Sequence, residues 1–260
     1  MIGPSILWLY GAPWLMAGVL GVLGAVLGSF IATLVLRWPQ ERSVMSGRSH
    51  CDGCDAVLQP YDLVPLVSAI LIGGRCRHCD GAINPLHWQI EALAMLIGVS
   101  AGLLITGPGA IIAALFGWLL LPLAVLDLTD FWLPDRLTAF LAIAGLAVGL
   151  TGMEPPLIER VIGGAGGFLA LWSIGKGYQL LRGREGLGGG DPKLLGAIGL
   201  WLGWRLLPIV LVLACMIGFG ALLFGYVTGR RAAWNDRLPL GTLMAVAAYP
   251  AEIIMLLPLA

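Results

Sequence analysis

Long apolar stretches separated by short polar ones follow one another along this chain from about residue 14 onward. An α-helix needs about 20 apolar residues to cross a membrane, with some allowance for short or broken spans. The pattern predicts eight membrane helices, with the weakest boundary near Arg205–Pro208. The predicted spans are Trp14–Leu36, Trp88–Ile105, Ala110–Leu126, Leu137–Leu150, Val161–Leu180, Leu194–Trp204, Leu207–Val227 and Leu240–Leu257.

Composition agrees with this pattern. Hydrophobic residues make up 58% of the chain and charged residues 12%, with a mean hydropathy of +0.90, whereas soluble domains are about 25% charged. We therefore expect an all-α polytopic membrane protein whose surroundings are the lipid bilayer. Fifteen basic residues balance fifteen acidic ones, and no nucleic-acid partner is expected. The predicted domains are a first span (1–36), a polar loop (37–87) and the remaining helices (88–260).

Basic residues are distributed unevenly among the polar stretches. If Arg37–His87 faces the cytoplasm, thirteen of the fifteen Lys and Arg residues lie on that side and only Arg160 and Arg205 on the other. The excess of Lys and Arg in cytoplasmic loops of membrane proteins favours this orientation. Both termini are then expected outside, and the turns near Asp127 and Asp191 inside.

Four of the five cysteines lie in the polar loop. They form two CxxC pairs, Cys51/Cys54 and Cys76/Cys79, with 21 residues between them. Four thiolates at this spacing are typical of a tetrahedral Zn²⁺ site that is structural because it has no open position. The alternative is a pair of redox-active or incidental thiols, since cytoplasmic cysteines rarely form stable disulfides. Cys215 lies alone in an apolar stretch and is expected to pack in the core.

A first group of acidic residues follows the third apolar stretch. Sixteen consecutive apolar residues, Ile111–Leu126, lead directly into Asp127. Its carboxylate is therefore expected at the cytoplasmic end of a span, where an ionisable residue is a functional-site hypothesis by default. Asp130 is interpreted as an interfacial residue. Asp135 lies just before the next apolar stretch and is interpreted as the N-cap of that helix.

A second acidic residue ends a glycine-rich segment. The run Gly188-Gly189-Gly190 leaves the backbone free to adopt positive φ angles and to approach another chain closely. Asp191 with Pro192 also suits an ordinary helix start, with aspartate as N-cap and proline at the first helical position. However, Asp127 and Asp191 are predicted on different spans, at the same depth and on the same face of the membrane.

The two aspartate motifs together resemble the type IV prepilin peptidases, a family of GxGD-type intramembrane aspartyl proteases. The matching residues are Asp127 with Leu133-Pro134-Asp135, and Gly188-Gly189-Gly190-Asp191-Pro192-Lys193. The cysteine loop and Gly28-Ser29-Phe30 resemble the family's amino-terminal cytoplasmic domain. The resemblance extends from about residue 25 to Gly241.

This resemblance implies that Asp127 and Asp191 are a catalytic pair. It implies cleavage of a short basic leader, after a glycine, from pilin-like precursors or pseudopilins of type II secretion. It also implies a multi-pass protein of the bacterial inner membrane whose zinc loop and active site face the cytoplasm. Many members of the family also N-methylate the new terminus with S-adenosylmethionine.

Several positions depart from the family pattern in the half of the chain associated with methylation. Ala32 stands where the family usually has Asn, and Ala69 where it usually has Trp. Leu86-His87-Trp88 replaces the usual Arg-Tyr-Pro before Glu91. These departures predict weak or absent methyl transfer, so S-adenosylmethionine is expected as a cofactor only if that activity is retained.

The chemistry expected of two neighbouring carboxylates is that of a coupled pair sharing a proton. One takes a proton from the attacking water, and the other protonates the oxyanion or the leaving amine. The run Gly188-Gly189-Gly190 is predicted to lie against the extended substrate backbone. Lys193 is a candidate for favouring ionised Asp191, with a positive anchor at the membrane surface as the alternative.

Two other functions fit parts of the pattern. A zinc-stabilised transporter or channel could relay protons or ions through buried aspartates, but the acidic residues are predicted at helix ends, with no charge near the middle of any span. A methyltransferase with a decayed protease is the second alternative. The presence of both Asp127 and Asp191 argues against it.

Overall fold

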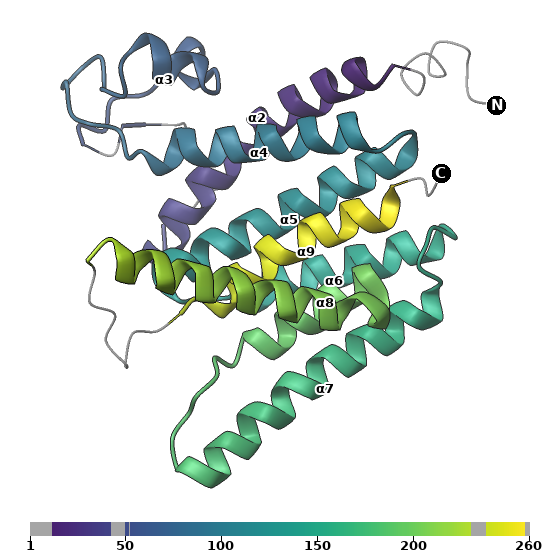
Figure 1. Ribbon diagram of the computed structural model, residues 1–260. Helices are drawn as coiled ribbons and strands as arrows, with labels where there is room; N and C mark the ends of the chain where they lie inside the picture. The colour runs from purple at the N-terminus through teal and green to yellow at the C-terminus, as the bar shows by residue number, and fades with distance from the viewer. Residues whose placement is uncertain (1–11, 43–49, 52, 230–237, 258–260) are drawn as a thin grey trace. The chain divides into compact units, whose positions relative to one another are not determined.

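The computed structural model describes residues 12–42, 50–51, 53–229 and 238–257. These residues fold almost entirely into helices, with only two isolated β-bridges among them (Figure 1). The all-α fold class predicted from the apolar stretches is confirmed. The elements are α2 (Pro13–Arg37), η1 (Trp38–Gln40), η2 (Pro60–Leu63), α3 (Val67–Leu71), α4 (Leu86–Leu104), α5 (Pro108–Asp130), α6 (Asp135–Leu150), α7 (Leu157–Arg182), α8 (Asp191–Val227) and α9 (Leu240–Leu256).

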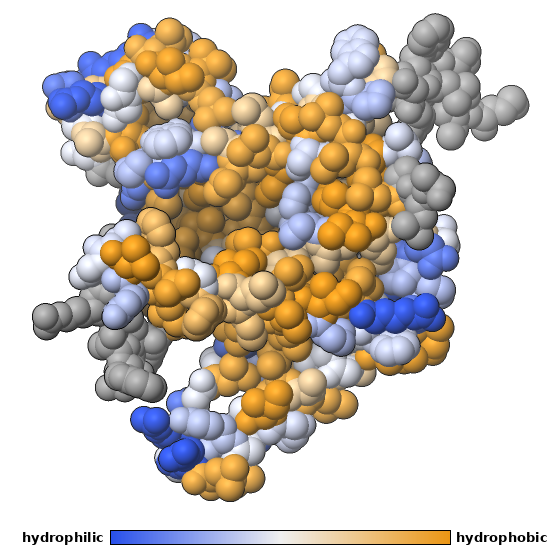
Figure 2. Space-filling view, in the orientation of Figure 1, coloured by the Kyte–Doolittle hydropathy of each residue, from blue (hydrophilic) through white to orange (hydrophobic). Residues whose placement is uncertain are grey.

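Five of the described helices are long and apolar enough to cross a membrane, namely α2 with η1, α4, α5, α7 and α8. The apolar helix α9 is shorter, with 17 residues. Hydrophobic side chains cover much of the surface seen in Figure 2, and α8 exposes Val212, Met216 and Phe219. Such a surface suits contact with lipid, and the chain is a multi-pass membrane protein. Cys215 is also exposed, so the prediction that it packs in the core is wrong.

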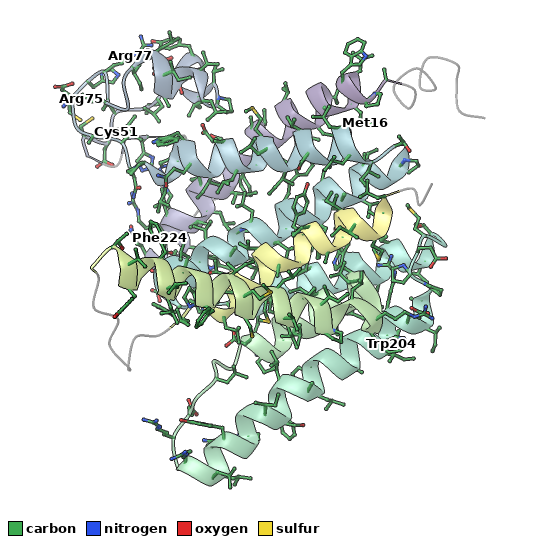
Figure 3. All side chains as sticks on the ribbon, in the orientation of Figure 1. Met16, Cys51, Arg75, Arg77, Trp204 and Phe224 are labelled. Carbon is green, nitrogen blue, oxygen red and sulfur yellow. The ribbon has the colours of Figure 1, made fainter. Side chains whose placement is uncertain are left out.

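The sixth and seventh predicted spans form one run, α8, in which two helices meet at Gly203. Gly203 has φ 70° and ψ 176°, a conformation that is essentially restricted to glycine. Figure 3 labels Trp204, just after the break, and Phe224 at the other end of the second helix. The prediction placed this boundary a few residues too late, because Arg205 and Pro208 are stronger polar and helix-breaking signals than one glycine.

The chain divides into two compact units, Met1–Pro122 and Leu123–Ala260. In the first unit α2 packs along α4 at glycines: a Cβ at Gly24 would overlap the carbonyl oxygen of Ala94, and one at Gly98 that of Leu20. Small residues allow membrane helices to approach this closely. The domain boundaries expected at residues 36 and 87 follow the polarity of the chain and stay a prediction.

In the second unit, α7 packs against the first helix of α8, again at glycines. A Cβ at Gly163 would lie 2.6 Å from the carbonyl oxygen of Gly199. Trp201, on the same helix, is fully buried, and its indole donates a 2.8 Å hydrogen bond to the carbonyl oxygen of Leu141 in α6. Close packing therefore fixes the helix that begins with Asp191.

Candidate active site and metal centre

Asp127 lies near the end of α5, and only 6% of it is exposed. Its Oδ2 accepts a 2.7 Å hydrogen bond from the backbone N–H of Thr242, and the Thr242 hydroxyl lies 3.2 Å from the same oxygen. Gly241 is so close that a Cβ there would lie 2.9 Å from Oδ2. The start of α9 therefore holds the Asp127 carboxylate in one orientation.

Asp191 is the first residue of α8, and it is also buried. Its Oδ2 accepts a 3.1 Å hydrogen bond from the backbone N–H of Gly188. The N-cap of α8 is Gly190, with no side-chain capping bond. The structure therefore contradicts the ordinary helix start, with Asp191 as N-cap, because the carboxylate is directed back to the glycine loop.

One leucine lies beside both aspartate motifs. A Cβ at Gly190, next to Asp191, would lie 2.7 Å from Leu133 Cβ, and a Cβ at Gly241, beside Asp127, would lie 2.9 Å from Leu133 Cδ1. The charge of Asp127 is also close enough to act on Asp191. The structure thus brings together two buried carboxylates that are 64 residues apart in the sequence.

The other predicted charged residues lie at the edge of this pair. Asp130 is exposed, and its Oδ2 accepts a 2.6 Å hydrogen bond from the hydroxyl of Thr129. The prediction that Asp135 caps α6 is wrong, since Pro134 is the N-cap and no side-chain capping bond forms. Asp135 instead forms an ion pair with Lys193, with 2.7 Å between Oδ1 and Nζ. Gly188 and Gly189 are exposed beside them.

Sequence reasoning missed the contribution of Gly241 and Thr242. They lie 114 and 115 residues beyond Asp127, and a Gly-Thr pair is common in any chain. The only available signal was their position at the start of the last apolar stretch, on the side of the membrane predicted for Asp127. That position predicts that they lie at the same membrane depth as Asp127, but it does not predict that they contact it.

The four cysteines predicted to bind metal converge in the first unit. Their sulfur atoms all lie within 4.8 Å of one another, and both the Cys51–Cys79 and the Cys54–Cys76 pairs are 4.0 Å apart. A tetrahedral ion with Zn–S bonds of 2.3 Å needs sulfur atoms about 3.8 Å apart. The donor set therefore fits Zn²⁺, with no open coordination position.

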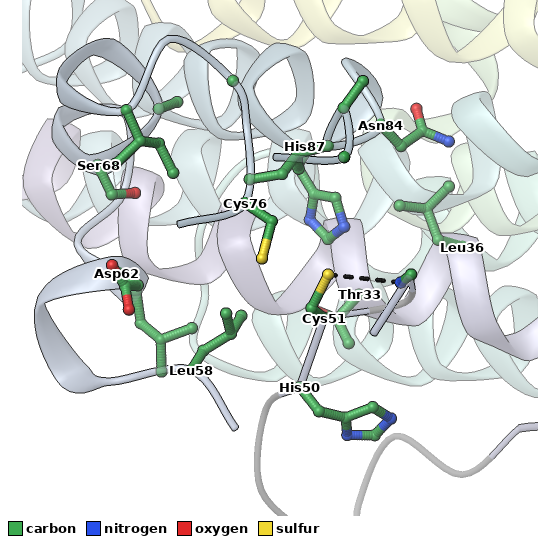
Figure 4. A pocket seen from close by; sticks show the side chains of 18 of the residues that line it. Thr33, Leu36, His50, Cys51, Leu58, Asp62, Ser68, Cys76, Asn84 and His87 are labelled. Carbon is green, nitrogen blue, oxygen red and sulfur yellow. Dashed lines mark hydrogen bonds between the residues drawn. The ribbon is translucent and has the colours of Figure 1, made fainter. Parts of the chain in front are cut away.

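The two CxxC turns repeat each other in detail. The N–H of Cys51 bonds the carbonyl oxygen of Ala56, the N–H of Cys76 bonds that of Gly81, and each turn lies between residues of an isolated bridge. The residue after each second cysteine, Asp55 or Asp80, has a positive φ angle. Figure 4 shows the Cys51 and Cys76 side chains directed toward the same space, with a hydrogen bond from the N–H of Gly53 to Cys51 Sγ.

Without metal, the clustered thiols compete for protons. Hydrogen bonds from the backbone N–H groups of His78 and Cys79 lower the pKa of Cys76 to about 6. A backbone hydrogen bond from Ala56 lowers the pKa of Cys54, but burial and the neighbouring thiols raise it to about 12. A cation that replaces these protons removes the competition, so metal binding should release protons.

A cavity of about 410 Å³ lies beside the cysteines in the first unit. Pockets of 300 to 1,000 Å³ are typical of small-molecule sites. The buried Glu91 lines the cavity, and its Oε2 accepts a 2.8 Å hydrogen bond from the N–H of Leu66. Three of the positions that depart from the family pattern, Ala69, His87 and Trp88, also line it. Other lining residues include Thr33, His50, Asp62 and Ser68 (Figure 4).

Models of known protein families match most of the chain. The family model described as Bacterial Peptidase A24 N-terminal domain matches residues 22–104, and that of the Type IV leader peptidase family matches residues 114–223. No solved structure matches the chain significantly.

Three relatives are each named "Prepilin leader peptidase/N-methyltransferase". The protein of Aeromonas salmonicida is 34% identical, over 93% of this chain and 92% of its own length. That of Burkholderia pseudomallei is 37% identical, over 86% and 81%, and that of Klebsiella pneumoniae 36%, over 78% and 92%. The predicted resemblance is confirmed, and the chain belongs to the type IV leader peptidase family.

Proposed function

We propose that this chain is a membrane-embedded aspartyl endopeptidase in which Asp127 and Asp191 are the catalytic pair. The observation that carries the proposal is the meeting of two buried carboxylates beside Leu133, each at the end of a membrane helix. Family membership supports a peptidase, and nothing in the comparisons supports the transporter or channel alternative. The substrates are then type IV prepilins or type II secretion pseudopilins, cleaved after a short basic leader.

In the proposed mechanism, the two carboxylates are oriented by hydrogen-bond donors from different segments of the chain. One carboxylate takes a proton from the water that attacks the scissile carbonyl, and the other protonates the oxyanion or the leaving amine. Thr242 orients Asp127 and Gly188 orients Asp191. Groups held in place before the substrate arrives need little reorganisation during the reaction, which lowers the barrier.

The glycine loop, Gly188-Gly189-Gly190, is the proposed binding site for the substrate backbone. No atom lies within 4 Å of the position that a Cβ would take at Gly189, whereas Gly190 is packed on Leu133. The open side of Gly189 therefore suits an extended peptide, while Gly190 shapes the site. Gly188 lies against Asp191, because a Cβ there would be 2.9 Å from Oδ2, and its exposed backbone is proposed to continue the binding site of the substrate. Lys193, paired with Asp135 at the edge of the site, completes the proposed substrate-binding set.

Cys51, Cys54, Cys76 and Cys79 are proposed to hold one structural Zn²⁺, which supplies part of the folding energy of the loop. S-adenosylmethionine, if used, would occupy the cavity beside these cysteines and supply a methyl group for the new amino terminus. Of the two carboxylates that line this cavity, Asp62 already pairs with Arg77, so Glu91 would be the one to face a cationic ligand. The family's location is the bacterial inner membrane, and we propose that the zinc loop and the aspartates face the cytoplasm.

The decisive experiment compares Asp127→Asn, Asp191→Asn and the double variant at equal membrane abundance. Each single change should reduce cleavage of a prepilin-like precursor at least about 100-fold, and the double variant should be little worse, because the pair acts as a unit. The new amino terminus is mapped by mass spectrometry.

The matched controls are Asp130→Asn and Asp135→Asn, which should keep measurable cleavage because both side chains lie at the edge of the site. An active Asp191→Asn variant would contradict the aspartyl peptidase proposal. An active Asp127→Asn variant together with an inactive Asp130→Asn or Asp135→Asn variant would show that the first catalytic residue is misassigned.

A further inference from the structure

The short helix α3 in the cysteine loop directs its apolar side outward. Its outer side carries Val67, Ile70 and Leu71, which are 51%, 79% and 74% exposed. Its inner side carries Ser68 and Ala69, which line the cavity beside the cysteines. A helix at the surface of a protein in water shows the opposite arrangement, with its apolar side toward the core and its polar side outward. The reversed pattern indicates that the surroundings of α3 are apolar.

The turn before α3 enlarges this apolar surface. Tyr61 and Val64 are also exposed, and with Val67, Ile70 and Leu71 they make five large apolar side chains within eleven residues, which we call the outer patch. Figure 2 shows hydrophobic side chains gathered at the place that α3 occupies in Figure 1. Exposed apolar patches of this kind mark sites that contact another protein or a membrane.

A hydrogen bond shows where the outer patch lies along membrane helix α4. The N–H of Leu66, directly before α3, donates a 2.8 Å hydrogen bond to Oε2 of Glu91. Glu91 is the sixth residue of α4, a helix long and apolar enough to cross a membrane. Trp88 lies about one turn nearer the start of α4 and is 45% exposed, and tryptophan is enriched where a membrane meets water. The chain therefore enters α3 at the depth of the membrane interface and not in open water.

The carboxylate of Glu91 fixes the turn from which α3 begins. Only 7% of Glu91 is exposed, and Glu252 in α9 is likewise buried, as the thirteenth of 17 residues of its helix. The prediction that acidic residues lie only at helix ends is therefore wrong. An ionisable side chain within a membrane is costly and indicates a function. Glu91 binds the N–H of Leu66, whose φ of 61° is rare for leucine, and so sets the direction in which α3 leaves the turn.

The distribution of charge around the outer patch suits lipid. Within residues 61–71 the only charged side chain is that of Asp62, which lines the cavity and pairs with Arg77 at 3.1 Å. The guanidinium of Arg77 also lies 5.2 Å from the centre of the Tyr61 ring, at the edge of the outer patch. An apolar centre bordered by tyrosine and arginine matches the boundary between acyl chains and lipid headgroups.

We propose that the outer patch is inserted into the membrane interface, in the leaflet on the side of the cysteine loop, with lipid as its partner. The apolar side of an interfacial helix typically reaches about 5 to 10 Å into the boundary between headgroups and acyl chains. The patch then holds the cysteine turns and the cavity against the membrane surface. This role belongs to the first unit alone and is independent of which residues cleave a substrate.

Photocrosslinking identifies what the outer patch touches. A photoreactive p-benzoylphenylalanine replaces Ile70 in the full-length protein, in vesicles of phosphatidylethanolamine and phosphatidylglycerol. Mass spectrometry then identifies the molecules joined to it after irradiation, and we expect phospholipid adducts. The matched control carries the same probe in place of Ser68, on the inner side of the same helix, and should give adducts within the protein with a much smaller lipid signal.

Absence of lipid adducts at Ile70 would overturn the inference, whether the probe instead joins peptides of a second copy, joins the second unit or joins nothing. An equal yield of lipid adducts from the Ser68 position would overturn it too, because the two sides of α3 would then be equivalent. If the variant at Ile70 does not accumulate, the probe is placed at Leu71, which is exposed on the same side.

A second test removes the apolar side chains. Ile70→Ser with Leu71→Ser should accelerate limited proteolysis of residues 37–87 in the same vesicles at least about tenfold, because the loop would spend more time away from the membrane. The melting temperature should stay unchanged, since both side chains lie outside the protein core. Ile70→Val with Leu71→Met keeps the patch apolar and should behave like the unaltered protein. Unchanged proteolysis of the serine variant, or a lower melting temperature, would contradict membrane insertion of the patch.

Discussion

At the scale of single residues, three glycines beside the aspartates differ in the space around them. A Cβ at Gly241 would lie 3.0 Å from Asp127 Cγ, and one at Gly190 would lie 2.7 Å from Leu133 Cβ. Beside Gly189 the space is open. The packing of the site therefore requires the absence of a side chain at Gly241 and Gly190. At Gly189, only a bound substrate would require it.

This difference predicts three distinct outcomes for substitution by alanine. Gly241→Ala and Gly190→Ala should lower kcat about 10- to 100-fold, because the new methyl group displaces Asp127 or Leu133. Gly189→Ala should leave thermal stability unchanged and raise KM, because the methyl group occupies space proposed for the substrate backbone. Kinetics with one precursor and a melting curve for each variant test this, and unchanged KM for Gly189→Ala would remove that residue from the substrate site.

A second prediction at this scale concerns methylation. Because Ala69, His87 and Trp88 all line the cavity beside the cysteines, we expect weak or absent methyl transfer, measured as the mass of the cleaved product after incubation with S-adenosylmethionine. Ala69→Trp, which restores the residue usual in the family, should increase methylation without changing cleavage. Stoichiometric methylation by the unaltered protein would show that these departures are harmless.

The sequence was informative where a residue is chemically unusual for its surroundings. Asp127 became a candidate because its carboxylate ends sixteen apolar residues, and the cysteines because four thiols lie in two close pairs. Gly241, Thr242 and Leu133 are ordinary residues for their positions, and their roles come from contacts with residues distant in the sequence. The ion pair of Lys193 with Asp135 was missed for the same reason.

At the scale of helices and turns, the cysteine loop depends on two short segments that contain almost no regular structure. Each CxxC turn is closed by backbone hydrogen bonds, and within the part of the loop that the structure describes no β-strand joins the two turns. A metal ion would therefore be the main link between them.

This arrangement predicts that Cys76→Ser lowers the zinc content well below one equivalent and accelerates proteolysis within residues 37–87. Cys215→Ser, which changes an exposed cysteine of α8, is the control and should retain full zinc content. Metal analysis of the purified proteins and limited proteolysis measure both effects. Absence of zinc from the unaltered protein would exclude the proposed metal centre.

Helix boundaries also show what hydropathy can and cannot predict. Among the described residues, seven apolar helices of different lengths lie along the eight predicted stretches, with α8 covering two of them, because helix formation inside a membrane follows from the need to pair every backbone group. The break within α8 was misplaced because it depends on the conformation of Gly203, and apolar sequence continues on both sides of it. Hydropathy reflects only the polarity of the residues, so it cannot locate a break in a helix within an apolar stretch.

At the scale of the whole molecule, the distribution of basic residues predicts the orientation in the membrane. A reporter fused within residues 37–87 should behave as cytoplasmic and one fused at the carboxyl terminus as external, because thirteen of fifteen basic residues then lie inside. Reporters active only on one side of the membrane, fused at both places, provide the measurement. The reverse pattern would place the aspartates on the outer face and contradict the proposed topology.

The hydrogen bonds from α9 to Asp127 affect how related genomes are interpreted. The Type IV leader peptidase family match ends at residue 223, before Gly241 and Thr242. A shortened or frameshifted relative that stops between these points would retain both aspartates and would still be classified as a peptidase. Without α9, its first aspartate would lack the donors that orient it. Such genes should encode inactive proteins, and intact α9 is a better criterion for an active enzyme than the aspartate motifs alone.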